Sequence, residues 1–306
     1  MNKHSNTLIY GYLSAIAATL FWSGNFTIAR GVIENIPPVS LAYWRWATAI
    51  VILAPFAVKP LISDWKIIKN HYIYLSITSI LGVSLFNTLI YISGHSTSAI
   101  NMSLIAITFP IFIIIISRII FNELITLNKS LGVLLVIAGV IILITKGDLF
   151  ILKNISFVAG DLWMLLAAIS FALYSILIKR KPVDLGIRSF QLSTFVMGLL
   201  FLTPFYLWES VTTSFQIKSI DNNTFYSILY LGIFASLFSY ILWGKAVETL
   251  GATKSSMIYY TLPIFSGLLA YIFLGEKIED IHLLSMLLIL IGVITAILEP
   301  KKPSYQ

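Results

Sequence analysis

The sequence predicts an all-α, polytopic membrane protein with ten transmembrane helices, arranged as two inverted five-helix repeats around a central cavity. Three observations support this fold class. The chain of 306 residues is 58% hydrophobic and only 11% charged, with a mean hydropathy of +0.92, whereas soluble domains are about 25% charged. Ten apolar runs are long enough to cross a bilayer, and the last five runs repeat features of the first five.

Each apolar run approaches the roughly 20 residues that a membrane helix needs. The runs cover residues 8–29, 39–58, 72–93, 98–120, 128–145, 157–178, 189–207, 225–244, 253–274 and 281–298. The first run is longer than a signal-peptide core and no A-x-A-like cleavage site closes it, so we expect it to be a membrane span. The longest connector covers residues 208–224, and we expect no soluble domain.

The basic residues predict how the chain is oriented. With ten spans and a cytoplasmic N-terminus, 14 of the 20 Lys and Arg fall in cytoplasmic segments and 5 in outer segments, while Arg45 remains within a span. This bias follows the positive-inside rule. It explains the net charge of +7 through topology and argues against nucleic acid as a partner. We therefore expect a multi-pass protein of the cell membrane, the bacterial inner membrane, with both termini cytoplasmic.

An internal repeat divides the chain. The segment PIFIIIISRIIFNE, from Pro110 to Glu123, recurs 153 residues later as PIFSGLLAYIFLGE. The same offset aligns Gly139 with Gly292. We expect one five-helix repeat over residues 8–145 and a second over 157–298. Because five is odd, the second repeat enters the membrane inverted, as in many secondary transporters, whose substrate site lies between the halves. The alternative is a duplication that serves packing alone.

Several motifs in both halves resemble the EamA-type members of the drug/metabolite transporter superfamily. They are FWSGNFTIARG at 21–31, PPVSLAYWRWATA at 37–49, SAINMSLIAITFPIF at 98–112 with FNELIT after it, and LGATKSSMIYYTLPIF at 250–265 with FLGEKI. The resemblance covers almost the whole chain, and the order, spacing and duplication of the motifs are its specific features. It implies ten helices, a central cavity and export or exchange of small metabolites, often amino acids. The second half departs from the pattern at YSILIKR, 174–180, which matches the Trp-Ser-Gly-Asn stretch poorly.

Trp22 and Asn25 are candidate substrate-binding residues in the first span. They lie three residues apart and so share a helical face. An unpaired amide within a membrane is unfavourable, so Asn25 needs a partner or a polar cavity. The alternative is that Asn25 bonds to a neighbouring helix and Trp22 is a packing residue.

Arg45 is the candidate with the strongest chemistry, because a charge within a span usually faces the bundle interior or water. It could bind a substrate carboxylate through two parallel hydrogen bonds. The alternative is that its side chain reaches the outer headgroups, with the neighbouring aromatic residues forming an interfacial belt.

Polar and aromatic residues in other spans complete the predicted site. A cavity for an aromatic or amphipathic solute would use such rings and hydroxyls. The substrate-binding candidates here are Asn87, Tyr91, Tyr240, Tyr259 and Tyr260, and we expect one of the last two to face inward.

Pro110 and Pro263 interrupt backbone hydrogen bonding at equivalent places in the two halves. We predict that they form a pair of hinges, the alternative being static shaping of the cavity. Glu123 and Glu276 follow at the span ends. For these we expect capping of the next helix or pairing with Lys129 or Lys277, and the alternative is a contact that gates one mouth.

The residue inventory predicts no metal, no cofactor and no catalytic role. Cysteine is absent, the four histidines are scattered, and neither an H-E-x-x-H nor a G-x-x-x-x-G-K motif occurs. All thirteen acidic residues lie at span ends or in connectors, so we expect a facilitator or exchanger, or proton coupling through a helix-end group.

The function predicted from these features is secondary transport of small metabolites by alternating access between the two halves. Neutral or aromatic amino acids, or related amphipathic compounds, are the expected substrates. Nucleoside-like substrates and an integral-membrane enzyme are the alternatives. The expected partners are the solute and membrane lipid. A homodimer is left open, because the small residues Gly132, Gly139, Ser285 and Gly292 could pack either within the chain or between copies.

Overall fold

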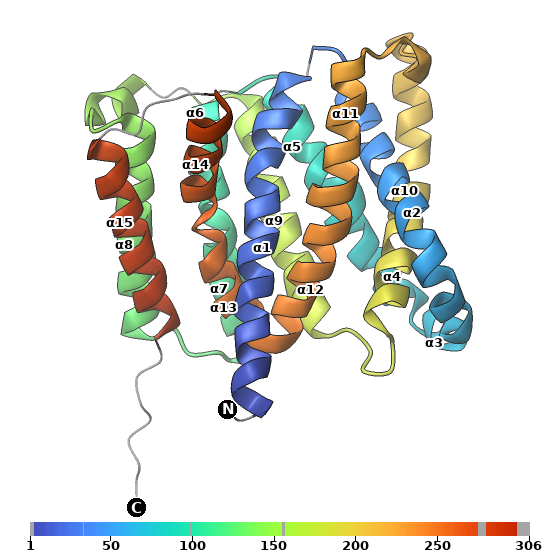
Figure 1. Ribbon diagram of the computed structural model, residues 1–306, viewed down its shortest axis with the longest axis horizontal. Helices are drawn as coiled ribbons and strands as arrows, with labels where there is room; N and C mark the ends of the chain where they lie inside the picture. Colours follow the sequence, from blue (N-terminus) through green and yellow to red (C-terminus); the bar gives the residue numbers. More distant parts are fainter. Residues whose placement is uncertain (1–2, 33, 98, 155–156, 275–279, 299–306) are drawn as a thin grey trace, which may run out of the picture.

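The computed structural model describes residues 3–32, 34–97, 99–154, 157–274 and 280–298, and all regular structure in these ranges is helical. The helices stand roughly side by side in one bundle (Figure 1). Eight helical segments among the described residues are long and apolar enough to cross a membrane. The chain is therefore a multi-pass membrane protein in its architecture.

In the first half of the chain the helices follow the predicted spans. They are α1 (Lys3–Gly31), α2 (Pro38–Ser63), the short α3 (Trp65–Asn70), the continuous run of α4 (Tyr72–Ser79), η1 (Ile80–Leu85) and α5 (Phe86–Gly94), then α6 (Ala99–Ala106), α7 (Thr108–Phe121) and α8 (Leu127–Thr145). A 3₁₀ turn, η2 (Leu149–Asn154), follows.

The second half is built in the same way. Its elements are α9 (Ala159–Lys179), α10 (Ile187–Thr212), the 3₁₀ turn η3 (Ile217–Ser219), the continuous run of α11 (Asn222–Tyr230), η4 (Leu231–Phe238) and α12 (Ser239–Leu250), then α13 (Ala252–Tyr259), α14 (Leu262–Leu274) and α15 (Asp280–Ile297). Segments α1 and α13–α14 are helical where spans were predicted but are not among the eight that meet the length and hydropathy criteria.

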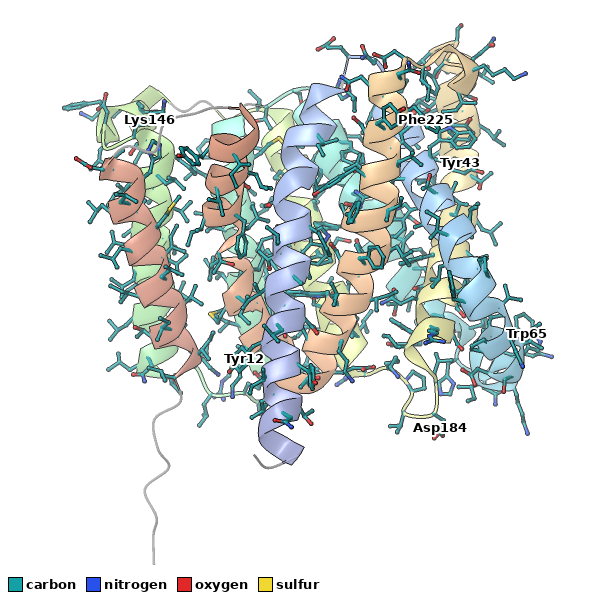
Figure 2. All side chains as sticks on the ribbon, viewed as in Figure 1. Tyr12, Tyr43, Trp65, Lys146, Asp184 and Phe225 are labelled. Atoms are coloured by element: carbon teal, nitrogen blue, oxygen red, sulfur yellow. The ribbon has the colours of Figure 1, made fainter. Side chains whose placement is uncertain are left out.

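Two ends of the bundle can be distinguished in Figure 2. Tyr12, Trp65 and Asp184 lie at one end, called the proximal face here, whereas Lys146 and Phe225 lie at the other, called the distal face (Figure 2). The loop between α9 and α10 lies at the proximal face. Helix α2 thus begins at the distal face, and its antiparallel neighbour α10 begins at the proximal face.

Elements η1 and η4 are π-helical, and each lies in the middle of a long membrane-spanning segment. In a π-helix each backbone N–H bonds to the carbonyl five residues earlier, and such turns often occur at functional sites. Hydropathy did not predict them, because they remain as apolar as the helices around them. They matter for the site because a backbone carbonyl in each, Gly82 in η1 and Ala235 in η4, accepts hydrogen bonds from distant side chains.

Each predicted proline kink corresponds to a short break in the helix. Between α6 and α7 the break falls at Ile107, and between α13 and α14 it falls at Tyr260 and Thr261. Pro110 and Pro263 then lie in the first turn of the helix that follows, where a missing N–H is tolerated. Their role as hinges stays a prediction.

Close helix pairs join the two halves of the chain. Helix α8 packs along α15, α2 along α10, α1 along α12 and α5 along α9. At the first of these contacts, a Cβ added to Gly132 would lie 2.5 Å from the carbonyl oxygen of Gly292. The small residues therefore bring two helices of one chain together. The outward faces of the bundle carry exposed apolar side chains, as a lipid-facing surface requires.

Candidate functional site

Arg45 lies in the centre of the bundle, two turns into α2, and its side chain is 0% exposed. The alternative in which it reaches the membrane surface is therefore wrong. Its Nε donates to the Ser236 hydroxyl at 2.7 Å, and its Nη2 donates to the Ala235 carbonyl at 3.1 Å. Its Nη1 lies 2.7 Å from Asn87 Oδ1, 2.5 Å from the Tyr91 hydroxyl and 3.2 Å from Asn25 Oδ1. All five acceptors are neutral oxygen atoms.

These partners come from both halves of the chain. Asn25 lies on α1, Asn87 and Tyr91 lie on α5, and Ala235 and Ser236 lie in the π-helical segment η4. The Tyr91 hydroxyl also donates to Asn25 Oδ1 at 3.2 Å, so these two first-half partners of Arg45 are hydrogen-bonded to each other. Arg45 therefore joins α1, α2 and α5 to η4.

A backbone carbonyl in the π-helical segment η4 also takes part in the network. Two side-chain donors share the Ala235 carbonyl, Arg45 Nη2 and the Trp22 indole N–H, the latter at 2.9 Å. The Ser236 hydroxyl donates back to Leu231, five residues earlier, at 2.8 Å, which follows the π spacing. Ala235 was not a predicted site residue. No pattern in the sequence reveals which backbone carbonyl will accept from a distant side chain.

Tyr240 links this group to the other π-helical segment. Its hydroxyl accepts from Asn87 Nδ2 at 3.0 Å and donates to the Gly82 carbonyl in η1 at 2.6 Å. Asn87 thus accepts from Arg45 with one end of its amide and donates to Tyr240 with the other. The hydrogen bonds run without a break from η4 through Arg45, Asn87 and Tyr240 to η1.

An aromatic group surrounds Trp22 beside this network. The ring centroid of Trp22 lies 5.9 Å from that of Tyr240, at an interplanar angle of 88°, and 6.0 Å from that of Tyr259, at 63°. Phe171 and Trp243 complete the group at 5.2 and 5.3 Å from Trp22. Edge-to-face rings at such separations attract one another. Phe171 was not predicted, because a single aromatic residue in an apolar run resembles ordinary core.

The structure therefore brings seven of the eight predicted substrate-binding residues together. They are Trp22, Asn25, Arg45, Asn87, Tyr91, Tyr240 and Tyr259. Tyr260 is different, because it is buried in a separate cluster with Val136 of α8 and Ile289 of α15. Of the two adjacent tyrosines, Tyr259 is therefore the one that lies with the other predicted site residues.

The charge on Arg45 has no counterion among the described residues. The ion pairs found in that part of the chain are Lys179–Glu123 and Lys181–Glu248, both away from Arg45. A buried charge is stabilised by an opposite charge or by dense hydrogen bonding, and Arg45 has only the latter. Nη2 carries two N–H groups, while only the Ala235 carbonyl accepts from it among the described residues.

Polar contacts at the proximal face lie outside this central group. The Glu123 carboxylate pairs with Lys179 at 2.8 Å and accepts from the Thr253 hydroxyl at 2.7 Å, while Thr126 caps α8. Burial would raise the pKa of Glu123, but these two hydrogen bonds outweigh it and lower the pKa below its ordinary value. Glu123 thus binds a different lysine from those expected and does not cap the next helix, and Glu276 lies outside the described residues.

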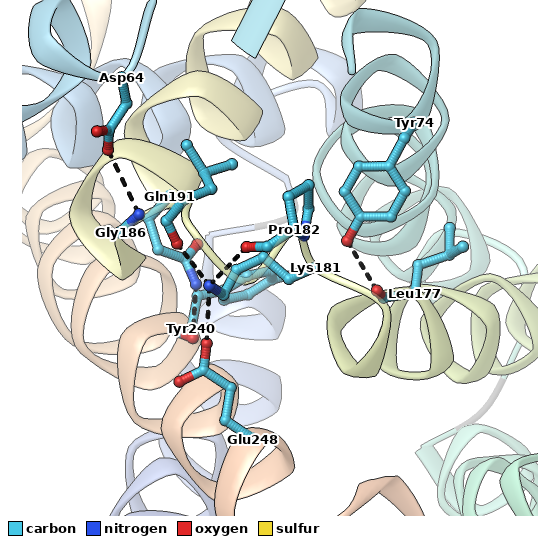
Figure 3. Close-up of polar contacts among 10 residues, drawn as sticks. Asp64, Tyr74, Leu177, Lys181, Pro182, Gly186, Gln191, Tyr240 and Glu248 are labelled. Atoms are coloured by element: carbon cyan, nitrogen blue, oxygen red, sulfur yellow. Dashed lines mark hydrogen bonds and ion pairs between the residues drawn. The ribbon is translucent and has the colours of Figure 1, made fainter. Parts of the chain in front are cut away.

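Lys181 forms a second proximal contact. Its ammonium donates to the Leu185 carbonyl at 2.5 Å and lies 3.3 Å from Glu248 (Figure 3). These contacts fix the loop between α9 and α10 against the end of α12. Close by in the view, Gln191 donates to the Tyr240 carbonyl at 2.9 Å (Figure 3).

The apolar bundle and its buried polar centre define a multi-pass membrane protein of the transporter class. The chain belongs to the EamA-like transporter family, whose model matches residues 9–145 and 158–298. Membership confirms the resemblance seen in the motifs. The family and its relatives indicate a transporter rather than an enzyme.

Curated relatives align with this chain over nearly its whole length and nearly the whole of their own. An uncharacterized transporter of Bacillus subtilis, YyaM, is 27% identical over 99% of this chain and 97% of its own length. An uncharacterized transporter of Archaeoglobus fulgidus is 25% identical over 90% of this chain and 92% of its own length. A solved crystal structure at 16% identity superposes with a TM-score of 0.72, covering 94% of this chain and 96% of its own. That likeness supports the fold alone.

Proposed function

We propose that this protein is a secondary transporter of small amphipathic metabolites that carry a carboxylate, with neutral or aromatic amino acids as the expected substrates. Arg45 binds the carboxylate, and the aromatic group around Trp22 packs against the apolar part. The observation that carries the proposal is a fully buried arginine whose five hydrogen bonds all go to neutral oxygens.

The energetics favour a site that is completed by an anion. An arginine side chain within a membrane is stabilised when a carboxylate takes part in its hydrogen bonding, because charge-assisted bonds are roughly twice as strong as neutral ones. The guanidinium also lies 5.3 Å from the ring centroid of Trp46 and 5.8 Å from that of Tyr91. Aromatic faces at this range stabilise the cation without neutralising it. The site therefore retains its attraction for a negative group.

Alternating access follows from where the contacts lie. We propose two five-helix halves, 8–145 and 157–298, related by inversion, with ten transmembrane helices in all and the site between them. Asn25, Asn87 and Tyr91 belong to the first half, and Ala235, Ser236 and Tyr240 to the second. Arg45 and Trp46 are fully buried, so a solute reaches them only when the halves separate at one face. Export, exchange and facilitated diffusion all use such a cycle. The basic-residue bias supports cytoplasmic termini in a bacterial inner membrane.

A binding experiment with matched ligands tests the assignment to Arg45. Purified protein is screened by thermal shift with phenylalanine, leucine, their decarboxylated amines and nucleosides, and flux is then measured in proteoliposomes. We expect the carboxylates to stabilise the wild type and the amines to have no effect. Arg45→Gln should weaken carboxylate binding by at least about tenfold, since a lost charge-assisted pair is worth roughly 1.5–3 kcal/mol. Arg118→Gln, which changes an exposed arginine on α7, is the control.

Three outcomes contradict the proposal. Equal stabilisation by amines and carboxylates would show that the site does not recognise the carboxylate. Selective stabilisation by nucleosides supports the alternative substrate class. Chemical conversion of a ligand during the flux assay supports an enzyme.

A further inference from the structure

The beginning of α2, the helix that carries Arg45, is not capped by a side chain of its own. The preceding residue is Pro37, whose side chain makes no capping hydrogen bond, and the first helical residue is Pro38, which has no N–H. Val39 and Ser40 therefore have backbone N–H groups with no carbonyl one turn earlier to accept them. Leu41 is the first residue whose N–H bonds to the preceding turn, to the Pro37 carbonyl at 2.9 Å.

Glu209, on α10 in the other half of the chain, supplies the missing acceptors. Its Oε1 accepts from the Val39 N–H at 3.1 Å, and its Oε2 accepts from the Ser40 N–H at 2.6 Å and from the Ser40 hydroxyl at 2.8 Å. The carboxylate is 7% exposed and makes no ion pair with any described residue. A helix N-terminus favours a negative group at this place. Every N–H in the first turn of α2 is thereby satisfied.

The opposite ends of the same two helices show the reciprocal contact. Asp64, the residue directly after α2, accepts from the N–H of Gly186, the residue directly before α10, at 3.4 Å (Figure 3). Gly186 offers α10 no side-chain cap, so a carboxylate from the neighbouring helix stands there too. This contact is long and exposed, and it reaches a single N–H. The distal contact is tight and the proximal contact is loose.

We infer that Glu209 and Asp64 are positioning residues that act as reciprocal latches between α2 and α10, one at each face. The Glu209 latch holds the distal end of α2 against the second half and so fixes the height and orientation of Arg45 between the halves. Opening at the distal face requires this latch to release. The Asp64 latch then tightens on the beginning of α10 and closes the proximal face. This assignment rests on the proposed transport cycle, since it names the contacts that alternate within it.

The absence of cysteine from the sequence allows a direct test. Ala42 and Ala57 are both 0% exposed on α2, the first near the Glu209 latch and the second near the Asp64 latch. Ala42→Cys and Ala57→Cys are made singly, and the rate of reaction with a bulky, water-soluble maleimide is measured on purified protein. Both faces are accessible in detergent, so the test depends neither on membrane orientation nor on any substrate.

We expect Glu209→Gln to raise the labelling rate of the cysteine at 42 by about tenfold and that at 57 by less than about twofold, since an amide accepts at one atom only. Glu209→Asp keeps the charge but is one methylene shorter, so it should give an intermediate rate. Asp64→Asn should raise labelling at 57 alone, and by less, because one long hydrogen bond is lost.

Unchanged labelling at 42 in folded Glu209→Gln overturns the inference, and so does an equal rise at 42 and 57, which indicates general loosening. If Glu209→Gln does not fold, the Glu209→Asp variant decides the question in the same way. The two experiments can fail independently. If the labelling is face-specific but the Arg45 binding experiment fails, the latch inference is supported and only the substrate assignment is contradicted.

Discussion

At the scale of single residues, polar side chains inside the membrane carry most of the information. Arg45, Asn25 and Asn87 were predicted as site residues because an unpaired polar group in a span is unfavourable. The structure joins the three by direct hydrogen bonds. The outcome follows from elementary energetics, since each group needs partners and lipid offers none. Whether they bind substrate stays a prediction, which the comparison of carboxylates with amines will decide.

Glu123 allows a residue-scale prediction about pH. Its pKa in the folded protein is lower than its ordinary value of 4.5, so folding favours the charged form. The stability that its contacts contribute is therefore fully present above pH 4.5 and is lost as the pH falls through the lowered pKa. We expect Glu123→Gln to lower the free energy of unfolding slightly at pH 7, by under about 1 kcal/mol because the pair is partly exposed, and this difference to shrink as the pH falls through the lowered pKa.

The measurement is thermal unfolding of wild type and variant in detergent across this pH range. Glu34→Gln changes an exposed carboxylate and is the control. A melting-temperature difference that grows as the pH falls would contradict the prediction, because it would mean that the protonated form is the one the fold stabilises.

At the scale of helices, the sequence predicted where helices lie but not their internal geometry. Each of the ten predicted ranges overlaps a helix, eight helical segments among the described residues meet the criteria for a membrane span, and the breaks before Pro110 and Pro263 match the expected kinks. The π-helical segments were missed because the register of hydrogen bonds inside an apolar helix leaves no trace in hydropathy. The acceptor role of Ala235 was missed for the same reason, since any residue type can supply a carbonyl. Glu209 was noted only as an acid at a span end, because its partners lie about 170 residues away.

The pairing of α8 with α15 yields a prediction at this scale. A Cβ on Gly132 would meet the Gly292 backbone at 2.5 Å, and backbone atoms cannot move aside as a flexible side chain can. We expect Gly132→Ala to destabilise the protein by roughly 1–3 kcal/mol, as measured by thermal unfolding.

Gly31→Ala is the matched control for this change, because nothing lies within 4 Å of the added atom. Replacing glycine by alanine at an open helical position is neutral or stabilising by up to about 1 kcal/mol. Equal effects of the two substitutions would show that the α8–α15 contact tolerates separation, and that the small residues are not what holds the pair together.

At the scale of the whole molecule, the two halves are joined by polar contacts at three levels. Glu209 bonds to α2 at the distal face, Arg45 bonds to η4 in the centre, and Glu123 bonds to Lys179 at the proximal face. The apolar surfaces between these levels can slide or separate with little directional penalty, because dispersion and hydrophobic contacts are not directional. Specific hydrogen bonds therefore decide which arrangement of the halves is stable, and a small number of polar residues can control it.

The orientation of the molecule in the membrane gives the last prediction. The basic residues predict that the loop between α9 and α10 lies in the cytoplasm, and that loop lies at the proximal face with Asp184. Val183 in this loop is 95% exposed, and Phe157, just before α9, is 83% exposed at the other end of that helix. We expect a membrane-impermeant thiol reagent to label Phe157→Cys in intact cells and Val183→Cys only after permeabilisation. The cysteine-free parent is the blank. The reverse pattern would show that the protein has the opposite orientation in the membrane with the same fold. It would also show that the charge bias does not set its topology.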